Sequence, residues 1–64
     1  MAWHEAEVRP DGNYFRAIVT LHSHAGPIVV AQGVYESKKE AEADLREFRS
    51  LYQYGRIDDY GRRR

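Results

Sequence analysis

The sequence predicts an α+β fold, a three-stranded antiparallel meander packed on one face by a single C-terminal helix (β-β-β-α). Two patterns lead to this prediction. The first half of the chain alternates apolar and polar residues between turn signals, as half-buried strands do, whereas residues 38–54 repeat apolar residues at helical spacing. Residues 35–42 join the two halves, and the rest of the fold is organised around this junction.

Size and composition set narrow limits on this fold. The chain has 64 residues and no cysteine, so neither a disulfide nor a thiolate metal site can reinforce its core. A domain of this size buries only about 60% of its unfolded surface. We expect one domain over residues 1–55 and a flexible basic tail over residues 56–64. No apolar run approaches the ~20 residues of a membrane span and no signal peptide is recognisable, so we expect a cytoplasmic protein.

The first predicted strand covers residues 3–9, in which apolar and charged residues alternate. A turn follows, and Asp11-Gly12 suits the two central positions of a type I′ hairpin. A loop of three residues is disfavoured, because the slip by one residue would place two glutamates on the apolar face. The favoured two-residue loop sets Val8 opposite Phe15, Ala6 opposite Ala17, and Glu7 opposite Arg16.

The second and third predicted strands cover residues 14–22 and 28–35, with a turn between them that contains Gly26. The second strand alternates and places Phe15, Ala17, Val19 and Leu21 on the face that packs against the helix. The third strand does not alternate, because residues 28–31 are all apolar. We expect Gly33 to mark a β-bulge. The residues predicted to point inward are Ile28, Val30 and Val34.

A capping box predicts where the helix begins. The Ser37 hydroxyl can accept a hydrogen bond from the Glu40 backbone N–H, and the Glu40 carboxylate can accept one from the Ser37 N–H. The helix runs from Lys38 to about Tyr54, and Gly55 suits the left-handed position that follows a helix. The apolar stripe that packs on the sheet consists of Ala41, Leu45, Phe48 and Tyr52.

The residues that could carry chemistry do not form a catalytic or metal-binding pattern. His22 and His24 lie near the end of one strand, but His4 lies on the other face of the predicted sheet, and zinc usually has four ligands. Ser23 lies in a turn without an orienting carboxylate, and there is no glycine-rich phosphate loop. We therefore expect no enzyme activity, no metal and no cofactor.

A single helix covers only one face of a sheet, so the sequence predicts an open second face. A marginal core, a third strand that is apolar on both faces and a neutral charge indicate that this face binds a protein partner, a second copy of the chain, or both. The predicted partner-binding residues are Trp3, Tyr14, Arg16, Ile18 and Thr20.

Nucleic acid binding is the alternative function. A strand pair or sheet can enter the major groove of DNA. The residues that would make these contacts are Arg16, Arg62, Arg63 and Arg64. Zero formal net charge, from ten basic and ten acidic residues, disfavours this alternative, because nucleic acid binding needs a clustered positive face.

The run from Val34 to Glu42, VYESKKEAE, resembles the segment that enters the helix in the N-terminal arm-type DNA-binding domain of phage-like tyrosine recombinases. This resemblance implies a three-stranded sheet with a C-terminal helix, and a sheet face that contacts DNA through the matching positions Tyr14, Arg16 and Thr20. The chain is also similar to the β-β-β-α unit of HicB-type antitoxins. In size it resembles small phage-encoded inhibitors, including anti-CRISPR proteins. The last two resemblances imply a protein partner.

Overall fold

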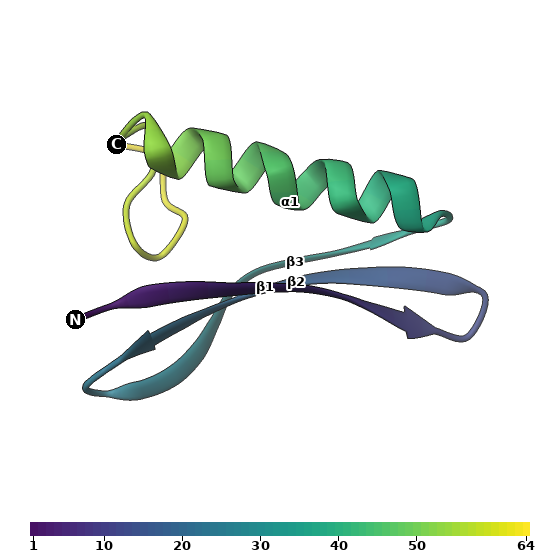
Figure 1. Cartoon of the computed structure of the whole chain (residues 1–64), viewed down its shortest axis with the longest axis horizontal. Coiled ribbons are helices and arrows are strands. Elements are labelled where there is room, and N and C mark those ends of the chain that lie inside the picture. Colours follow the sequence, from purple (N-terminus) through teal and green to yellow (C-terminus); the bar gives the residue numbers. More distant parts are fainter.

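The computed structural model describes residues 1–64 and confirms the predicted β-β-β-α order (Figure 1). Its elements are β1 (Trp3–Asp11), β2 (Tyr14–Ser23), β3 (Gly26–Tyr35) and α1 (Lys38–Gln53). The strands form one antiparallel sheet in the order β1-β2-β3, and α1 lies across one face of it. The single helix is too short and too polar to span a membrane.

The first hairpin turns one residue later than the sequence predicted. Gly12 and Asn13 form the turn, and Asp11 pairs with Tyr14. Gly12 has a φ of 63° and no non-glycine residue has a positive φ, which fits a type II′ turn, because the expected type I′ turn needs two positive φ values. All pairs therefore shift by two residues, so the same side chains face inward with different partners. The observed pairs are Ala6–Val19, Glu7–Ile18 and Val8–Ala17.

The bulge in β3 lies at Val30, whereas the sequence predicted it at Gly33. Val30 has no partner on β2, because the register of the ladder shifts between Val19 and Thr20. The extra residue reverses which side chains face inward beyond it. Val34 therefore lies on the face away from the helix and is 51% exposed, which corrects the inward position predicted for it.

The remaining part of β3 agrees better with the prediction. Ile28 lies on the helix side as predicted but is 50% exposed, and Val30 is half-buried. Gly33 provides space for the side chain of Tyr35, since a β-carbon on Gly33 would lie 2.8 Å from the Tyr35 hydroxyl. Partial burial, together with the nearby Asp44 carboxylate, raises the pKa of Tyr35.

The helix begins and ends where the sequence predicts. Ser37 is the N-cap, and its Oγ accepts a hydrogen bond from the Glu40 N–H at 3.2 Å, although the reciprocal bond of the capping box does not form. Gly55 follows the helix with a φ of 71°, and two backbone hydrogen bonds close the last turn in a Schellman arrangement. Ala41, the first residue of the helix stripe, is completely buried.

The core is small and lies mainly between the sheet and the elements that cover it. Its buried residues are Ala17, Ile18, Val19, Leu21, Ala41 and Ile57. Ile57 belongs to the segment for which the sequence predicted a flexible tail, so this segment contributes to the core.

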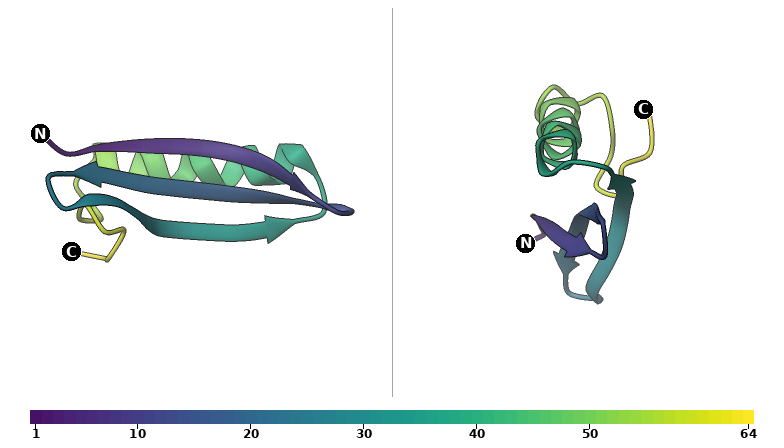
Figure 2. Two further views of the ribbon diagram at one scale, coloured as in Figure 1. Left: turned by 90° about the horizontal axis from the view of Figure 1, so that it is seen from below. Right: turned by 90° about the vertical axis from the view of Figure 1, so that its right-hand side faces the viewer.

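Residues 54–64 form a folded C-terminal loop, which differs from the flexible tail expected for residues 56–64. Ile57 is only 4% exposed and forms an isolated antiparallel bridge with Arg63. The loop descends from the end of α1 on the helix side of the sheet (Figures 1 and 2). A single helix leaves part of a three-stranded sheet uncovered, and the loop buries apolar surface there.

Three contacts anchor the C-terminal loop. Gly61 has a φ of 78° and passes so close to Phe48 that a β-carbon on it would lie 3.1 Å from the Phe48 ring. His4 Nε2 donates to the Asp59 carbonyl at 2.8 Å, and the Tyr52 hydroxyl donates to Asp59 Oδ1 at 2.9 Å. This second hydrogen bond, assisted by partial burial, raises the pKa of Tyr52. The loop therefore connects β1 to the end of α1.

Asp58 organises the interior of the same loop. Its Oδ1 accepts hydrogen bonds from the backbone N–H groups of Tyr60 and Arg62, each at 2.9 Å. The hydrogen bond from the Arg62 amide is the main reason that the pKa of Asp58 lies below its ordinary value of 3.8. The ionised carboxylate thus favours the folded loop.

Candidate functional site: the open face of the sheet

The open face of the sheet is the side that neither α1 nor the C-terminal loop covers, and it is turned toward the viewer in the left part of Figure 2. The strand register defines its residues, and all five predicted partner-binding residues are among them. The open face consists of Trp3, Glu5, Glu7, Arg9 and Asp11 on β1, Tyr14, Arg16, Ile18, Thr20 and His22 on β2, and Pro27, Val29, Gln32 and Val34 on β3.

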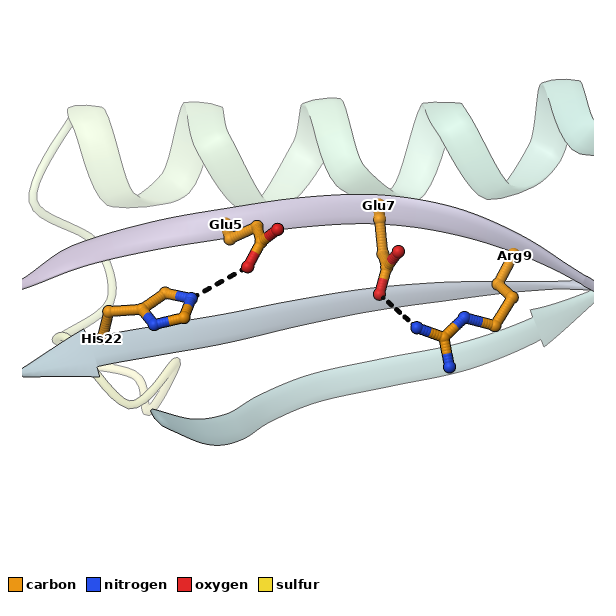
Figure 3. A network of polar contacts seen from close by, with 4 residues as sticks. All are labelled: Glu5, Glu7, Arg9 and His22. Carbon is orange, nitrogen blue, oxygen red and sulfur yellow. Dashed lines mark hydrogen bonds and ion pairs between the residues drawn. The ribbon is translucent and has the colours of Figure 1, made fainter. Parts of the chain in front are cut away.

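The arginines of the open face are paired with carboxylates of the same face. Arg9 and Arg16 lie directly opposite each other, an arrangement that is unfavourable when both charges are free. Arg9 donates to Glu7 at 2.8 Å (Figure 3), and Arg16 donates to Asp11 at 2.6 Å. Exposed pairs of this kind contribute only ~0–1 kcal/mol to stability. Their main consequence is that the open face presents no unpaired arginine.

Aromatic side chains mark the two ends of the open face. The His22 ring stacks on Trp3 with centroids 4.3 Å apart, and His22 Nε2 donates to the Glu5 carboxylate at 2.9 Å (Figure 3). Trp3 nevertheless remains 57% exposed, and Tyr14 is half exposed at the opposite end of β2. Stacked aromatic side chains are stiff and amphipathic, which suits them to contact a partner surface.

Ile18 is the one predicted contact residue that is buried in the structure. It lies at the centre of the open face, between Glu7 and Gln32, and is only 9% exposed. Side chains of the two edge strands flank the central strand on both sides and cover it. Thr20 and Arg16, on the same strand, are half-buried.

Val29 and Val34 are exposed apolar residues of the open face that sequence reasoning did not assign to it. Each is about half exposed. The only signal in the sequence was the absence of alternation in residues 28–31, which indicates a strand with two apolar faces. The bulge at Val30 turns Val34 outward, and the sequence pattern did not locate that bulge, whereas Val29 precedes it and lies on the side opposite to Ile28.

The predicted nucleic acid contacts do not lie together. Arg16 belongs to the open face, whereas Arg62, Arg63 and Arg64 belong to the C-terminal loop on the helix side (Figure 1). Within the loop, the Arg62 guanidinium lies 5.4 Å from the centre of the Tyr60 ring, and Arg64 Nε donates to a backbone carbonyl at 3.3 Å.

The open face is suited to contact with another surface rather than to enclosing a small molecule. The hollows in the molecular surface are all bordered by α1, on the other side of the sheet. No group of three histidine, aspartate or glutamate side chains is placed to hold a metal ion. His24, the third histidine of the chain, is exposed in the turn between β2 and β3.

Comparison with known proteins gives no relative for this chain. No model of a protein family matches it, and no curated protein or solved structure matches it either. The resemblances to the recombinase arm-type domain, to HicB-type antitoxins and to small phage-encoded inhibitors therefore stay predictions from the sequence.

Proposed function

We propose that this protein is a small non-enzymatic module that binds another protein through the open face, with a second copy of the chain as one such partner. The observation that carries the proposal is the exposure of Trp3, Val29 and Val34 on a face whose arginines are already paired. Burying such a face removes apolar surface from water and leaves no arginine without a counter-ion. Both effects favour a protein partner.

The open face has about the area that a single partner needs. The molecule measures 35 by 24 Å in its two larger dimensions. A stable interface of standard size buries ~800 Å² on each partner, so nearly the whole face would take part. Action as a phage or mobile-element accessory or inhibitor protein in the cytoplasm is a narrower form of the same proposal, in which the module blocks a surface of its target.

DNA binding through the open face is the second candidate, and it has less support. Arg16, the basic residue common to both predictions, is engaged by Asp11 and also donates to Gln32 at 3.3 Å. A gel shift at about 50 mM salt, where phosphate contacts are strong, tests this candidate. Retarded DNA that is released by Arg16→Ala would favour it over protein binding.

Self-association is tested by sedimentation equilibrium over a wide concentration range. For a homodimer, the apparent mass rises toward twice the monomer mass, and Val34→Asp returns it to the monomer value by burying a charge in the interface. Ser50→Asp is the matched control, because it adds the same charge to the exposed side of α1. A dimer that persists unchanged in Val34→Asp would show that the open face is not its interface.

For a monomer, the corresponding test uses a photo-reactive amino acid in place of Trp3 to identify the cellular partner, followed by binding measurements with that purified partner. We expect Val34→Asp to weaken the complex by about tenfold or more, which corresponds to ~1.4 kcal/mol, and Ser50→Asp to leave it unchanged. Equal affinities for the two variants would contradict the proposed function.

A further inference from the structure

A second surface lies apart from the centre of the open face, along the outer edge of β1. A shallow groove of about 400 Å³ runs there between β1 and α1, with Ala6, Val8 and Leu45 as its apolar lining. Strand β1 has no neighbour on this side, so half of its backbone N–H and C=O groups point outward along the groove. An edge of this kind can accept an additional strand.

The helix side of this groove carries an excess of positive charge. Lys38, Arg46 and Arg49 line it, and none of them forms an ion pair or a side-chain hydrogen bond. Glu7 and Glu42 also line the groove. The Glu7 carboxylate is already neutralised by its ion pair on the open face. The groove therefore differs from the open face, where both arginines are paired.

We propose that this groove binds an extended acidic segment of a partner protein, which adds to β1 as a fourth strand. Lys38 and Arg46 are separated by ~12 Å along the helix axis. Two residues four positions apart in an extended strand point to the same side and are separated by ~13 Å. Two carboxylates at this spacing can therefore reach both cations. Glu42 lies midway between these cations along the helix, so the segment's side chain between the two carboxylates is a neutral, apolar one that packs on Ala6 and Val8 of β1.

The alternation of a strand also defines the remaining positions of the segment. Side chains between those that face the helix point toward the open-face side of β1, where Glu5 and Glu7 lie. Acidic residues there would be repelled, so neutral residues are favoured. The expected recognition pattern is acidic, neutral, apolar, neutral, acidic.

Two labelled peptides of identical composition test this pattern by fluorescence anisotropy. The first, Thr-Glu-Thr-Val-Thr-Glu-Thr, places both carboxylates and the valine on one side of a strand. The second, Thr-Thr-Glu-Glu-Val-Thr-Thr, does not. We expect the first peptide to bind about fivefold more tightly or better, and to shift the backbone amide NMR signals of residues 4–9.

Lys39 supplies a matched control for its neighbour Lys38. Lys38→Glu and Arg46→Glu each replace attraction by repulsion, and we expect each to weaken the first peptide by about tenfold. Lys39→Glu makes the same charge change at an exposed residue outside the groove and should leave the affinity unchanged. Val34→Asp on the open face should also have no effect, which separates this site from the proposed function.

Several results would overturn the proposal. Failure of the first peptide to bind, equal affinity for both peptides, or equal losses for Lys38→Glu and Lys39→Glu would each leave no specific strand site. If Lys38→Glu abolished self-association and Val34→Asp did not, the groove would bind a second copy of the chain rather than a partner protein.

Discussion

On the helix side of the sheet, Ala17, Val19 and Leu21 of the central strand are buried, whereas on the open face only Ile18 is. The helix side is closed by two elements, α1 and the C-terminal loop. The open face instead balances its arginines within the sheet and leaves large apolar side chains in water. This difference indicates that the helix side supplies most of the stability, while the open face contributes less to it.

The largest expected effect is a difference in stability between two truncations, one on each side of the sheet. Ile57→Ala on the helix side removes a buried side chain and should destabilise the protein by ~3 kcal/mol. Val29→Ala on the open face removes a half-exposed side chain and should cost under ~1 kcal/mol. Urea denaturation followed by circular dichroism measures both. Similar losses for the two variants would contradict the assignment of stability to the helix side and the packed position of the C-terminal loop.

A smaller effect tests how closely the C-terminal loop approaches α1. Gly61→Ala forces a non-glycine residue into the left-handed region and places a β-carbon against Phe48, so we expect a loss of ~2 kcal/mol. Gly55→Ala introduces similar backbone strain with no atom within 4 Å of the new β-carbon, and should cost ~1 kcal/mol. Thermal unfolding of both variants gives the difference. If Gly61→Ala is no worse than Gly55→Ala, the loop does not press against Phe48.

The smallest expected effect is a loss of stability of the C-terminal loop at low pH. The pKa of Asp58 is lower in the folded loop than in the unfolded chain, so its contribution is complete above pH ~4 and is lost as the pH falls through the folded value. We expect the NMR signals of Ile57 and Arg62 to move toward those of an unfolded loop in this range, while β2 stays folded. Asp58→Asn keeps an acceptor oxygen without the charge and should remove this pH dependence. Unchanged acid behaviour in that variant would assign the effect to other carboxylates.

Sequence reasoning succeeded where local signals decide the structure. The Ser37 cap and Gly55 fixed the ends of the helix, because capping depends on a few neighbouring residues. Alternation identified the inward face of β1 and β2 even though the predicted pairing was wrong. A shift of two residues preserves the side-chain period of a strand, so the pattern cannot distinguish these two registers.

The residues of the candidate site were predicted only in part, because alternation fixes neither the register of a strand nor the burial of a side chain. Trp3 and Tyr14 were correctly placed on the open face, since alternation alone puts them there, and the structure leaves both exposed. Ile18 shares their face, but its burial depends on the neighbouring strands. Val34 joins the open face only because the bulge at Val30 reverses the side chains beyond it, and the sequence did not locate this bulge.

By itself, the sequence determined the order of the elements, the caps of α1 and the inward face of the first two strands. The tertiary structure alone decided the register of the strands, the bulge in β3 and the packing of residues 54–64. These features depend on contacts between residues far apart in the chain. Ile57 is buried because its loop folds back onto the rest of the chain, where Gly61 approaches Phe48 and the Val30 carbonyl, and no local pattern around Ile57 predicts this packing.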